Sequence, residues 1–234
     1  MIDVSALGGV RLVPRDAAEA LRKMRWWDDF YSSWHPQQNL PISDWELQQF
    51  QRHIAPFART AVDVGCGWGL MAQEMASEGL WTTGYDWSHA AVEGARSLTA
   101  GIDRVRFRWH DFLAPQGPPD IEPESVDVLS CRLVLPYLPL NRFLSQACSW
   151  LKPDTGVMYV VVQVWENQDP GMRRGYPDSI VEDIRVGWRT SSRWDLDPAG
   201  EVTALALTGP PRRLASPAGL PHTGESGAQA PTPH

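Results

Sequence analysis

The sequence predicts an α/β fold: a seven-stranded, doubly wound and mostly parallel sheet with a terminal antiparallel hairpin and an N-terminal helical cap. Between residues 60 and 164, short apolar runs alternate with helix-forming segments five times, which is the pattern of a parallel sheet. The fifth run, Gly156 to Val164, is almost entirely apolar, as expected for a strand buried on both faces. Two stretches that flank Asp197-Pro198-Ala199-Gly200 predict the hairpin.

The composition is that of one main globular domain with modest extensions. The chain has 234 residues, of which 43% are apolar and 21% charged, enough for a sizeable core. The formal net charge of −7 comes without a run of Lys or Arg, so we expect no nucleic-acid partner. No stretch approaches about eighteen uninterrupted apolar residues, so we expect no membrane partner.

The cysteines and the N-terminus predict the compartment. Cys66, Cys131 and Cys148 are odd in number and lack the spacing of metal ligands, which predicts free thiols, a reducing compartment and no metal site. The N-terminus has no basic segment followed by an apolar run. We therefore expect a cytoplasmic protein, and the sequence leaves its oligomeric state unknown.

Residues 1–58 are predicted to form a helical cap or lid. A run of helix formers, Ala17 to Met24, continues into an aromatic cluster, Trp26 to His35, that is too aromatic for an exposed helix. Ser43-Asp44-Trp45-Glu46 has the pattern of a capping box, in which Ser43 is the N-cap and Glu46 reaches back to it. The apolar side chains that follow, from Trp45 to Ile54, predict a helix that ends by Pro56.

The central region, residues 59–208, is predicted to hold the sheet. Its elements are assigned from periodicity, capping residues and glycines. The expected strands are 60–64, 81–86, 105–111, 126–131, 156–164, 190–196 and 202–208, and the expected helices begin at Leu70, after Ser88, at Asn141 and near Asp178. Residues 209–234 are rich in Pro, Gly, Ala and Ser, which predicts a disordered tail.

The strand 60–64 runs into glycines at every second position, Gly65, Gly67 and Gly69. Glycines remove side chains where a strand turns into a helix, so that backbone N–H groups approach a ligand closely. A dinucleotide fingerprint requires its third glycine at position 70, where the chain has Leu70, so NAD is disfavoured. The chain also lacks the glycine-rich Lys-Ser/Thr motif of nucleotide hydrolases.

The segment from Asp63 to Gly69 resembles motif I of the class I S-adenosylmethionine-dependent methyltransferases: an acid, any residue, then Gly-x-Gly-x-Gly. The resemblance continues in the family's order through Asp86, Asp111, the segment 126–138 and Leu151-Lys152-Pro153. It covers roughly residues 59–165, and the terminal hairpin agrees with the antiparallel seventh strand of the family. The resemblance implies a Rossmann-like fold and S-adenosyl-L-methionine as the cofactor.

This resemblance gives the expected cofactor-binding residues. The backbone N–H groups of the turn approach the amino-acid end of the cofactor, and Asp63 receives its ammonium group, directly or through water. Asp86 accepts both ribose hydroxyls, and Asp111 accepts from the exocyclic amine of adenine. The complete set is Asp63, Gly65, Cys66, Gly67, Gly69, Asp86, Trp87 as a flat face for adenine, Asp111, the backbone of Phe112, and Arg132.

Structural alternatives stay open for several of these residues. Asp63 and Asp111 are also suited to capping helices, and Trp87 to core packing. Arg132 either reaches the carboxylate of the cofactor or extends to the surface.

Catalysis is expected to depend on alignment in a water-poor site, and on a base only if the acceptor is protonated. Tyr31 and His35 are candidates to assist an acceptor proton, and Tyr137 to line the acceptor pocket. The family often has a pair of histidines where this chain has Pro136-Tyr137, which argues against a histidine base there. We favour a functional role for Trp34 too, and core packing for three further aromatic side chains, Trp26, Trp27 and Phe30.

The sequence thus predicts an enzyme that methylates a small molecule. Its aromatic, net-acidic cap indicates a small and partly apolar acceptor, either a thiol, halide or metalloid, or the hydroxyl, amine or carbon of a natural product. Two other classes of function remain: a protein that binds the cofactor without methyl transfer, either cyclase-like or regulatory, and a protein methyltransferase.

Overall fold

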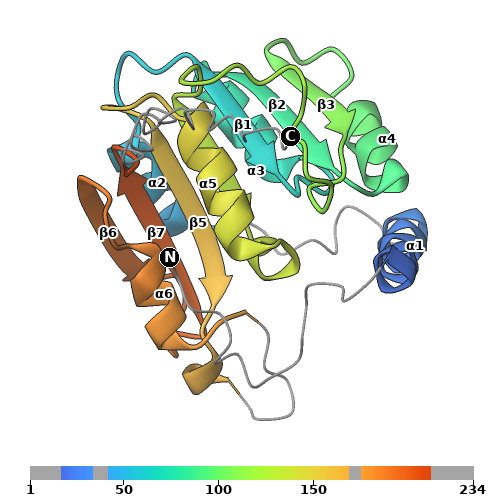
Figure 1. The fold of residues 1–234 in the computed structure, drawn as a ribbon. Coiled ribbons are helices and arrows are strands. Elements are labelled where there is room, and N and C mark those ends of the chain that lie inside the picture. Colours follow the sequence, from blue (N-terminus) through green and yellow to red (C-terminus); the bar gives the residue numbers. More distant parts are fainter. Residues whose placement is uncertain (1–16, 34–41, 169–174, 212–234) are drawn as a thin grey trace, which may run out of the picture.

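The sheet has seven strands in the order β3-β2-β1-β4-β5-β7-β6 (Figure 1). In this computed structural model, which describes residues 17–33, 42–168 and 175–211, β1 to β5 are parallel to their neighbours. Strand β7 is antiparallel to both β5 and β6. The predicted fold class, including the terminal hairpin, is confirmed.

The strands begin and end close to their predicted bounds. They are β1 (Thr60–Val64), β2 (Trp81–Asp86), β3 (Val105–Trp109), β4 (Val128–Arg132), β5 (Val157–Gln163), β6 (Thr190–Asp195) and β7 (Val202–Thr208). The prediction that the third strand reaches Asp111 is wrong. The chain turns there instead, because the Asp111 side chain accepts a hydrogen bond from the Leu113 backbone N–H, 2.8 Å away.

The helices cover both faces of the sheet (Figure 1). Two of them pack on one face, where α5 and α6 bury Phe143 and Ile180 against Val62 and Val160. The opposite face is covered by α2, α3 and α4, which contribute Phe50, Met75 and Ala95. The helices are α1 (Ala17–Ser33), α2 (Asp44–His53), α3 (Leu70–Ser77), α4 (His89–Leu98), α5 (Leu140–Trp150) and α6 (Asp178–Ile184), with short 3₁₀ helices η3 (Leu135–Tyr137) and η4 (Trp165–Asn167).

The connection from β3 to β4, residues 110–127, contains no helix. A crossover between parallel strands usually carries one. On the α5 side, an irregular loop is therefore what the described residues provide to cover the part of the sheet made by β2 and β3.

The outer edge of β3 is hydrogen-bonded by a side chain of the neighbouring helix. The guanidinium of Arg96, on α4, donates to the backbone oxygen of Phe107 through Nε at 3.1 Å and Nη2 at 2.9 Å. This contact ties α4 to the edge of the sheet.

Helix α2 confirms one half of the predicted capping box and corrects the other. The Ser43 hydroxyl accepts from the Glu46 N–H at 3.1 Å, so Ser43 is the N-cap as predicted. The Glu46 side chain does not reach back, because it is buried and pairs with Arg132. Since this face of α2 points inward, Trp45 is 49% exposed rather than buried.

The predicted tail lies mostly outside the described residues, which end at residue 211. The division into a cap (1–58), a central domain (59–208) and a tail (209–234) stays a prediction. None of the helices in the described part of the chain combines the length and the apolar character that crossing a membrane requires.

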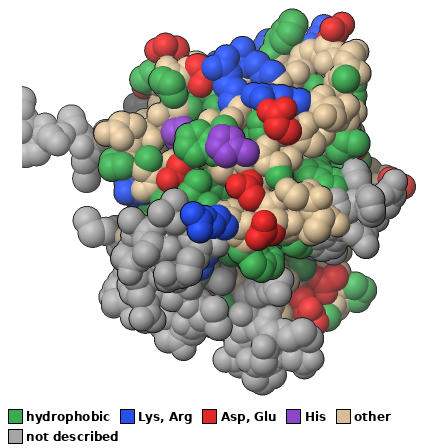
Figure 2. All heavy atoms as spheres, turned by 90° about the vertical axis from the view of Figure 1, so that its right-hand side faces the viewer, with side chains coloured by type: hydrophobic (Ala, Val, Ile, Leu, Met, Phe, Trp, Pro, Cys, Tyr) green, Lys and Arg blue, Asp and Glu red, His purple; other side chains and the backbone are tan. Residues whose placement is uncertain are grey.

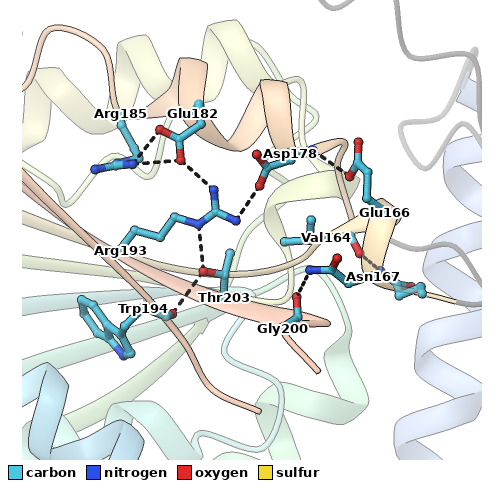
Figure 3. Close-up of polar contacts among 11 residues, drawn as sticks. Val164, Glu166, Asn167, Asp178, Glu182, Arg185, Arg193, Trp194, Gly200 and Thr203 are labelled. Atoms are coloured by element: carbon cyan, nitrogen blue, oxygen red, sulfur yellow. Dashed lines mark hydrogen bonds and ion pairs between the residues drawn. The ribbon is translucent and has the colours of Figure 1, made fainter. Parts of the chain in front are cut away.

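Arg193 joins the end of the sheet to α6 (Figure 3). From β6, its guanidinium contacts Asp178 and Glu182 on α6, each at 2.6 Å. Its Nε donates to the Thr203 hydroxyl of β7 at 3.2 Å. The Arg193 side chain is 20% exposed, so this network is shielded more than a surface ion pair.

We predict that Arg193→Ala lowers the free energy of unfolding by about 1–3 kcal/mol, because three hydrogen-bonded partners lose their donor in a partly buried position. Urea denaturation measures the change. The matched control is Arg189→Ala, whose side chain is 54% exposed and pairs with Asp154, and which we expect to change stability by less than about 0.5 kcal/mol. Equal effects of the two substitutions would contradict a structural role for this network.

Candidate functional site

A cavity of about 260 Å³ lies at the carboxyl ends of β1, β2 and β4. The turn after β1 forms its floor, η3 and the loop after β3 form two walls, and α1 contributes aromatic side chains. The predicted residues that line it are Tyr31, Asp63, Gly65, Cys66, Gly67, Asp86, Trp87, Phe112, Arg132 and Tyr137. In open α/β sheets, this end of the strands is where ligands bind.

The glycine turn forms a floor without side chains. Gly65 and Gly67 have φ angles of +66° and +53°, a left-handed conformation that other residues adopt at a cost. A Cβ atom on Gly67 would lie 2.6 Å from the Tyr31 hydroxyl, and one on Gly65 would lie 2.4 Å from Val134. Glycine is therefore required at both positions by backbone conformation and by space.

Gly69 contributes to the turn in another way. It is the N-cap of α3 and does not line the cavity among the described residues. A Cβ atom on Gly69 would lie 2.3 Å from the Phe107 ring. Its role is to let α3 pack closely against β3.

Asp86 is buried at the end of β2 and is bound by the backbone on both sides. The N–H of Gly67 donates to Oδ2 and the N–H of Ser88 donates to Oδ1, each at 2.9 Å. Burial raises the pKa of Asp86 to about 6, although these hydrogen bonds lower it. Each oxygen keeps further acceptor capacity, so the carboxylate is oriented to bind a pair of donors in the cavity.

Asp63, at the end of β1, is 2% exposed. Within the described part of the chain, its Oδ2 atom has no hydrogen-bond partner. Burial raises its pKa to about 7, with Asp86 adding to the rise, while Ser130 and Arg132 lower it. A buried acceptor without a donor at the floor of a cavity is suited to a ligand that brings a donor or a positive charge.

Asp111 is not brought to this cavity. Among the described lining residues, the loop after β3 is represented by Phe112 and Leu113. The Asp111 carboxylate instead accepts from the Leu113 N–H. The chain thus places the two residues after Asp111, rather than Asp111 itself, along the cavity wall.

Arg132 lines the cavity from the end of β4, held by a buried acid. Its Nε and Nη2 atoms donate to the two carboxylate oxygens of Glu46 at 2.8 and 3.0 Å, and the Tyr159 hydroxyl donates to the same carboxylate at 3.2 Å. Of the two alternatives for Arg132, the structure argues against extension to the surface, because its side chain is only 18% exposed, and the contact with the cofactor stays a prediction. Sequence reasoning missed Glu46, which the capping-box pattern assigned to another contact.

Helix α1 brings aromatic side chains over the turn. Trp27, Phe30 and Tyr31 line the cavity, so the expectation that Trp27 and Phe30 only pack in a core is wrong. The same expectation fails for Trp26, which is 57% exposed. Trp34 and His35 lie outside the described residues.

Asp28 fixes α1 to the body of the protein. Its Oδ1 accepts from the Ser88 hydroxyl at 2.7 Å and from the Ala90 N–H at 3.2 Å, at the N-terminus of α4. A carboxylate is favourable at this end of a helix. Asp28 was not among the predicted site residues.

Tyr31 and Tyr137 both contact the ring of Trp27. The rings of Trp27 and Tyr31 are stacked with centroids 5.8 Å apart, and Tyr137 meets Trp27 edge-on at 5.7 Å. Burial, reinforced by Asp86 and Cys66, raises the pKa of Tyr31 well above its ordinary value of 10.0. Tyr31 therefore keeps its proton at neutral pH and acts as a hydrogen-bond donor.

We predict that the stability of the ligand-free protein falls as pH rises from about 4 to 7, in part because of Asp63. In this window the unfolded chain releases the proton, at an ordinary pKa of 3.8, whereas the folded chain keeps it up to about 7. The folded state binds more protons, so raising the pH favours unfolding. In Asp63→Asn this contribution is absent. The midpoint temperature of thermal unfolding should therefore fall less between pH 5 and pH 7.5 in this variant than in the wild type.

Asp103→Asn is the control, because Asp103 is exposed, and it should decline as the wild type does. The comparison between variants removes the contributions of other titrating groups such as His53 and His110. Identical pH profiles for the wild type and Asp63→Asn would contradict a protonated, buried Asp63.

Comparison with known proteins gives one family. A family model described as a methyltransferase domain matches residues 61–154. Ubiquinone biosynthesis O-methyltransferase of Neisseria meningitidis is 28% identical over 142 residues, which are 59% of this chain and 57% of the relative. The protein of the same name from Burkholderia vietnamiensis is 30% identical over 139 residues, 58% of this chain and 56% of the relative. The chain thus spans a little over half the length of these curated relatives.

Solved structures share the fold. A putative methyltransferase of Haloferax volcanii, in complex with the Trm112 methyltransferase activator, has a TM-score of 0.58 and 18% identity, covering 82% of this chain and 97% of the other. Phosphoethanolamine N-methyltransferase 1 of Haemonchus contortus has a TM-score of 0.57 and 15% identity, covering 83% and 50%. At this identity the likeness concerns the fold.

Proposed function

This chain carries a class I S-adenosylmethionine-dependent methyltransferase domain. From this premise we propose that the chain transfers the methyl group of S-adenosyl-L-methionine to a small-molecule acceptor. The observation that carries the proposal is the pair of buried carboxylates, Asp63 and Asp86, beside a glycine turn in a cavity with aromatic walls. Two buried acids with raised pKa values are suited to a ligand that carries positive charge.

The residues present fit this cofactor. The unpartnered Oδ2 of Asp63 is an acceptor for the ammonium group, and the oriented carboxylate of Asp86 is an acceptor for the ribose hydroxyls. Trp87 and Phe112 line the part of the cavity next to Asp86 and offer apolar contact for adenine. When bound, S-adenosyl-L-methionine supplies an electrophilic methyl group on a sulfonium.

The aromatic side chains of α1 would exclude water and orient the acceptor. Trp27, Phe30 and Tyr31 face the turn from above, and Tyr137 closes the side. Tyr31 would donate a hydrogen bond to the acceptor or to the cofactor, since burial raises its pKa and keeps the hydroxyl protonated. The described lining residues include no His or Lys, so we propose an acceptor atom that is nucleophilic without a strong base.

The proposed acceptor is small and partly aromatic or apolar. The curated relatives are named for O-methylation in ubiquinone biosynthesis, and a ring hydroxyl acidic enough to ionise without a protein base is one acceptor that such aromatic walls would hold. The acidic net charge argues against a nucleic-acid substrate. Cys66, Cys131 and Cys148 form no disulfide in the part of the chain that the structure describes, which supports a reducing, cytoplasmic location.

We predict that S-adenosylhomocysteine and S-adenosyl-L-methionine bind the wild type in calorimetry and that NAD does not. Asp86→Ala should weaken both by at least about tenfold, because hydrogen bonds to a charged group are worth about 1.5–3 kcal/mol. Asp103→Ala, which removes an exposed acid outside the cavity, should bind as the wild type does. Tight NAD binding, or unchanged affinity in Asp86→Ala, would overturn the cofactor assignment.

We predict that Tyr31→Phe lowers turnover by about tenfold or more while affinity for S-adenosylhomocysteine changes by less than about threefold. The substitution removes one hydroxyl and keeps the ring that fills the cavity. Tyr137→Phe serves as the matched comparison in the wall. Formation of S-adenosylhomocysteine with a panel of small acceptors measures turnover.

Other outcomes separate the alternative functions. Cofactor binding without product from any acceptor would favour a binding or regulatory protein. Activity on lysate proteins but not on small molecules would favour a protein methyltransferase. Unchanged turnover in Tyr31→Phe would remove this hydroxyl from the mechanism.

A further inference from the structure

A second cavity, of about 430 Å³, lies at the opposite ends of the same strands. It is lined by the amino-terminal parts of β1, β2 and β3 and by Asp120, Ile121 and Ser125 of the loop between β3 and β4. This is the face on which the β3–β4 crossover lacks a helix. The hollow is therefore separate from the proposed methyl-transfer site, which lies at the carboxyl ends of the strands.

Arginines surround this cavity, although the chain as a whole is acidic. Arg104 and Arg106 line it, and Arg108 follows on the same face of β3. The acid at the cavity is Asp120, whose Oδ2 lies 3.3 Å from Arg108 Nε and 3.9 Å from Arg106 Nη2. Good charge-assisted hydrogen bonds are about 2.7–2.9 Å long. The cavity thus carries an excess of positive charge that its own carboxylate neutralises only loosely.

The guanidinium of Arg106 is held in position at the cavity. Arg106 Nε donates to the Thr83 hydroxyl at 2.8 Å, while its side chain remains 61% exposed. A guanidinium has five N–H donors, and the hydrogen bond to Thr83 uses one of those of Arg106. A planar fork fixed at its base is suited to bind a carboxylate or a phosphate through two hydrogen bonds.

An exposed aromatic ring lies beside the fork. Trp81, the first residue of β2, is 61% exposed and lines the cavity. The guanidinium of Arg104 lies 5.5 Å from the centre of this ring and donates to the Gly79 backbone oxygen at 2.8 Å. Arg104 has a φ angle of +69°, which costs about 1 kcal/mol or more for a residue with a side chain. This backbone conformation occurs at the residue whose guanidinium lies over the Trp81 ring.

Figure 2 shows the side of the molecule that carries α4 and β3. Lys and Arg side chains gather in its upper part, with an acidic side chain beside them.

We propose that this second cavity binds a small organic anion attached to a flat ring, a phosphate monoester or a carboxylate. The remaining N–H donors of Arg106 and Arg104 receive the anion, and the ring lies against the exposed part of Trp81. A volume of about 430 Å³ is in the range of small-molecule sites.

Titration of the full chain with four probes tests the proposal: phenyl phosphate, benzoate, inorganic phosphate and phenol. We expect phenyl phosphate or benzoate to bind at least about fivefold more tightly than inorganic phosphate, and phenol to bind least, because anion and ring both contribute. Comparing the affinities of phenyl phosphate and benzoate shows whether the site prefers a phosphate or a carboxylate. Equal affinity for phenyl phosphate, benzoate and inorganic phosphate would overturn the proposal.

Variants locate the site. The double substitution Arg104→Ala with Arg106→Ala should weaken the preferred probe by about tenfold or more, and Trp81→Leu should abolish the advantage of the ring. Arg189→Ala, which removes an exposed arginine at the other end of the sheet, is the control and should bind as the wild type does. Unchanged affinity in the double variant would contradict the assignment.

Binding of S-adenosylhomocysteine to each variant shows that it is folded. If the proposed methyl-transfer function fails, the probe titrations still decide this site. If none of the probes binds, this proposal is overturned, while cofactor binding at the other cavity still tests the proposed function.

Discussion

The constraint on which this structure depends is the burial of two carboxylates, Asp63 and Asp86, at the carboxyl ends of neighbouring strands. Each is buried because the chain turns over it: the glycine turn covers Asp86 with the Gly67 N–H, and β1 carries Asp63 into the sheet. Their raised pKa values express chiefly the cost of burying a charged carboxylate away from water. A cationic ligand would relieve this cost, which gives the cavity a preference for positive charge before any specific contact forms.

Contacts distant in sequence complete the cavity around these acids. Asp28 attaches α1 to the beginning of α4, so the aromatic wall is fixed next to the strand end that carries Asp86. Glu46 attaches α2 to Arg132 and Tyr159, which fixes the wall formed by β4. Both contacts use an acid from the N-terminal region, and both orient side chains that face the cavity.

The fold and the floor of the site could be predicted from the sequence because they depend on local patterns. Strands β1, β2 and β7 begin and end at the predicted residues, since apolar runs bounded by glycines or acids define them. The partners of Glu46 and Asp28 could not be predicted, because Arg132 lies 86 positions from Glu46 and Ser88 lies 60 positions from Asp28. The roles of Asp111 and Tyr137 remain predictions, and the outward position of Trp26 follows from how α1 docks rather than from its own sequence.

Arg96 has a consequence for how this protein meets other chains. A strand at the edge of a sheet offers unpaired backbone groups to any extended segment nearby, and such edges are starting points for aggregation. At β3 the Phe107 oxygen already receives two N–H groups from a side chain of the same molecule. A strand from another molecule must displace the Arg96 guanidinium, which donates both hydrogen bonds, before it can pair with β3 and extend the sheet. This protection against self-association matters most during protein synthesis, when many copies of the chain are close together.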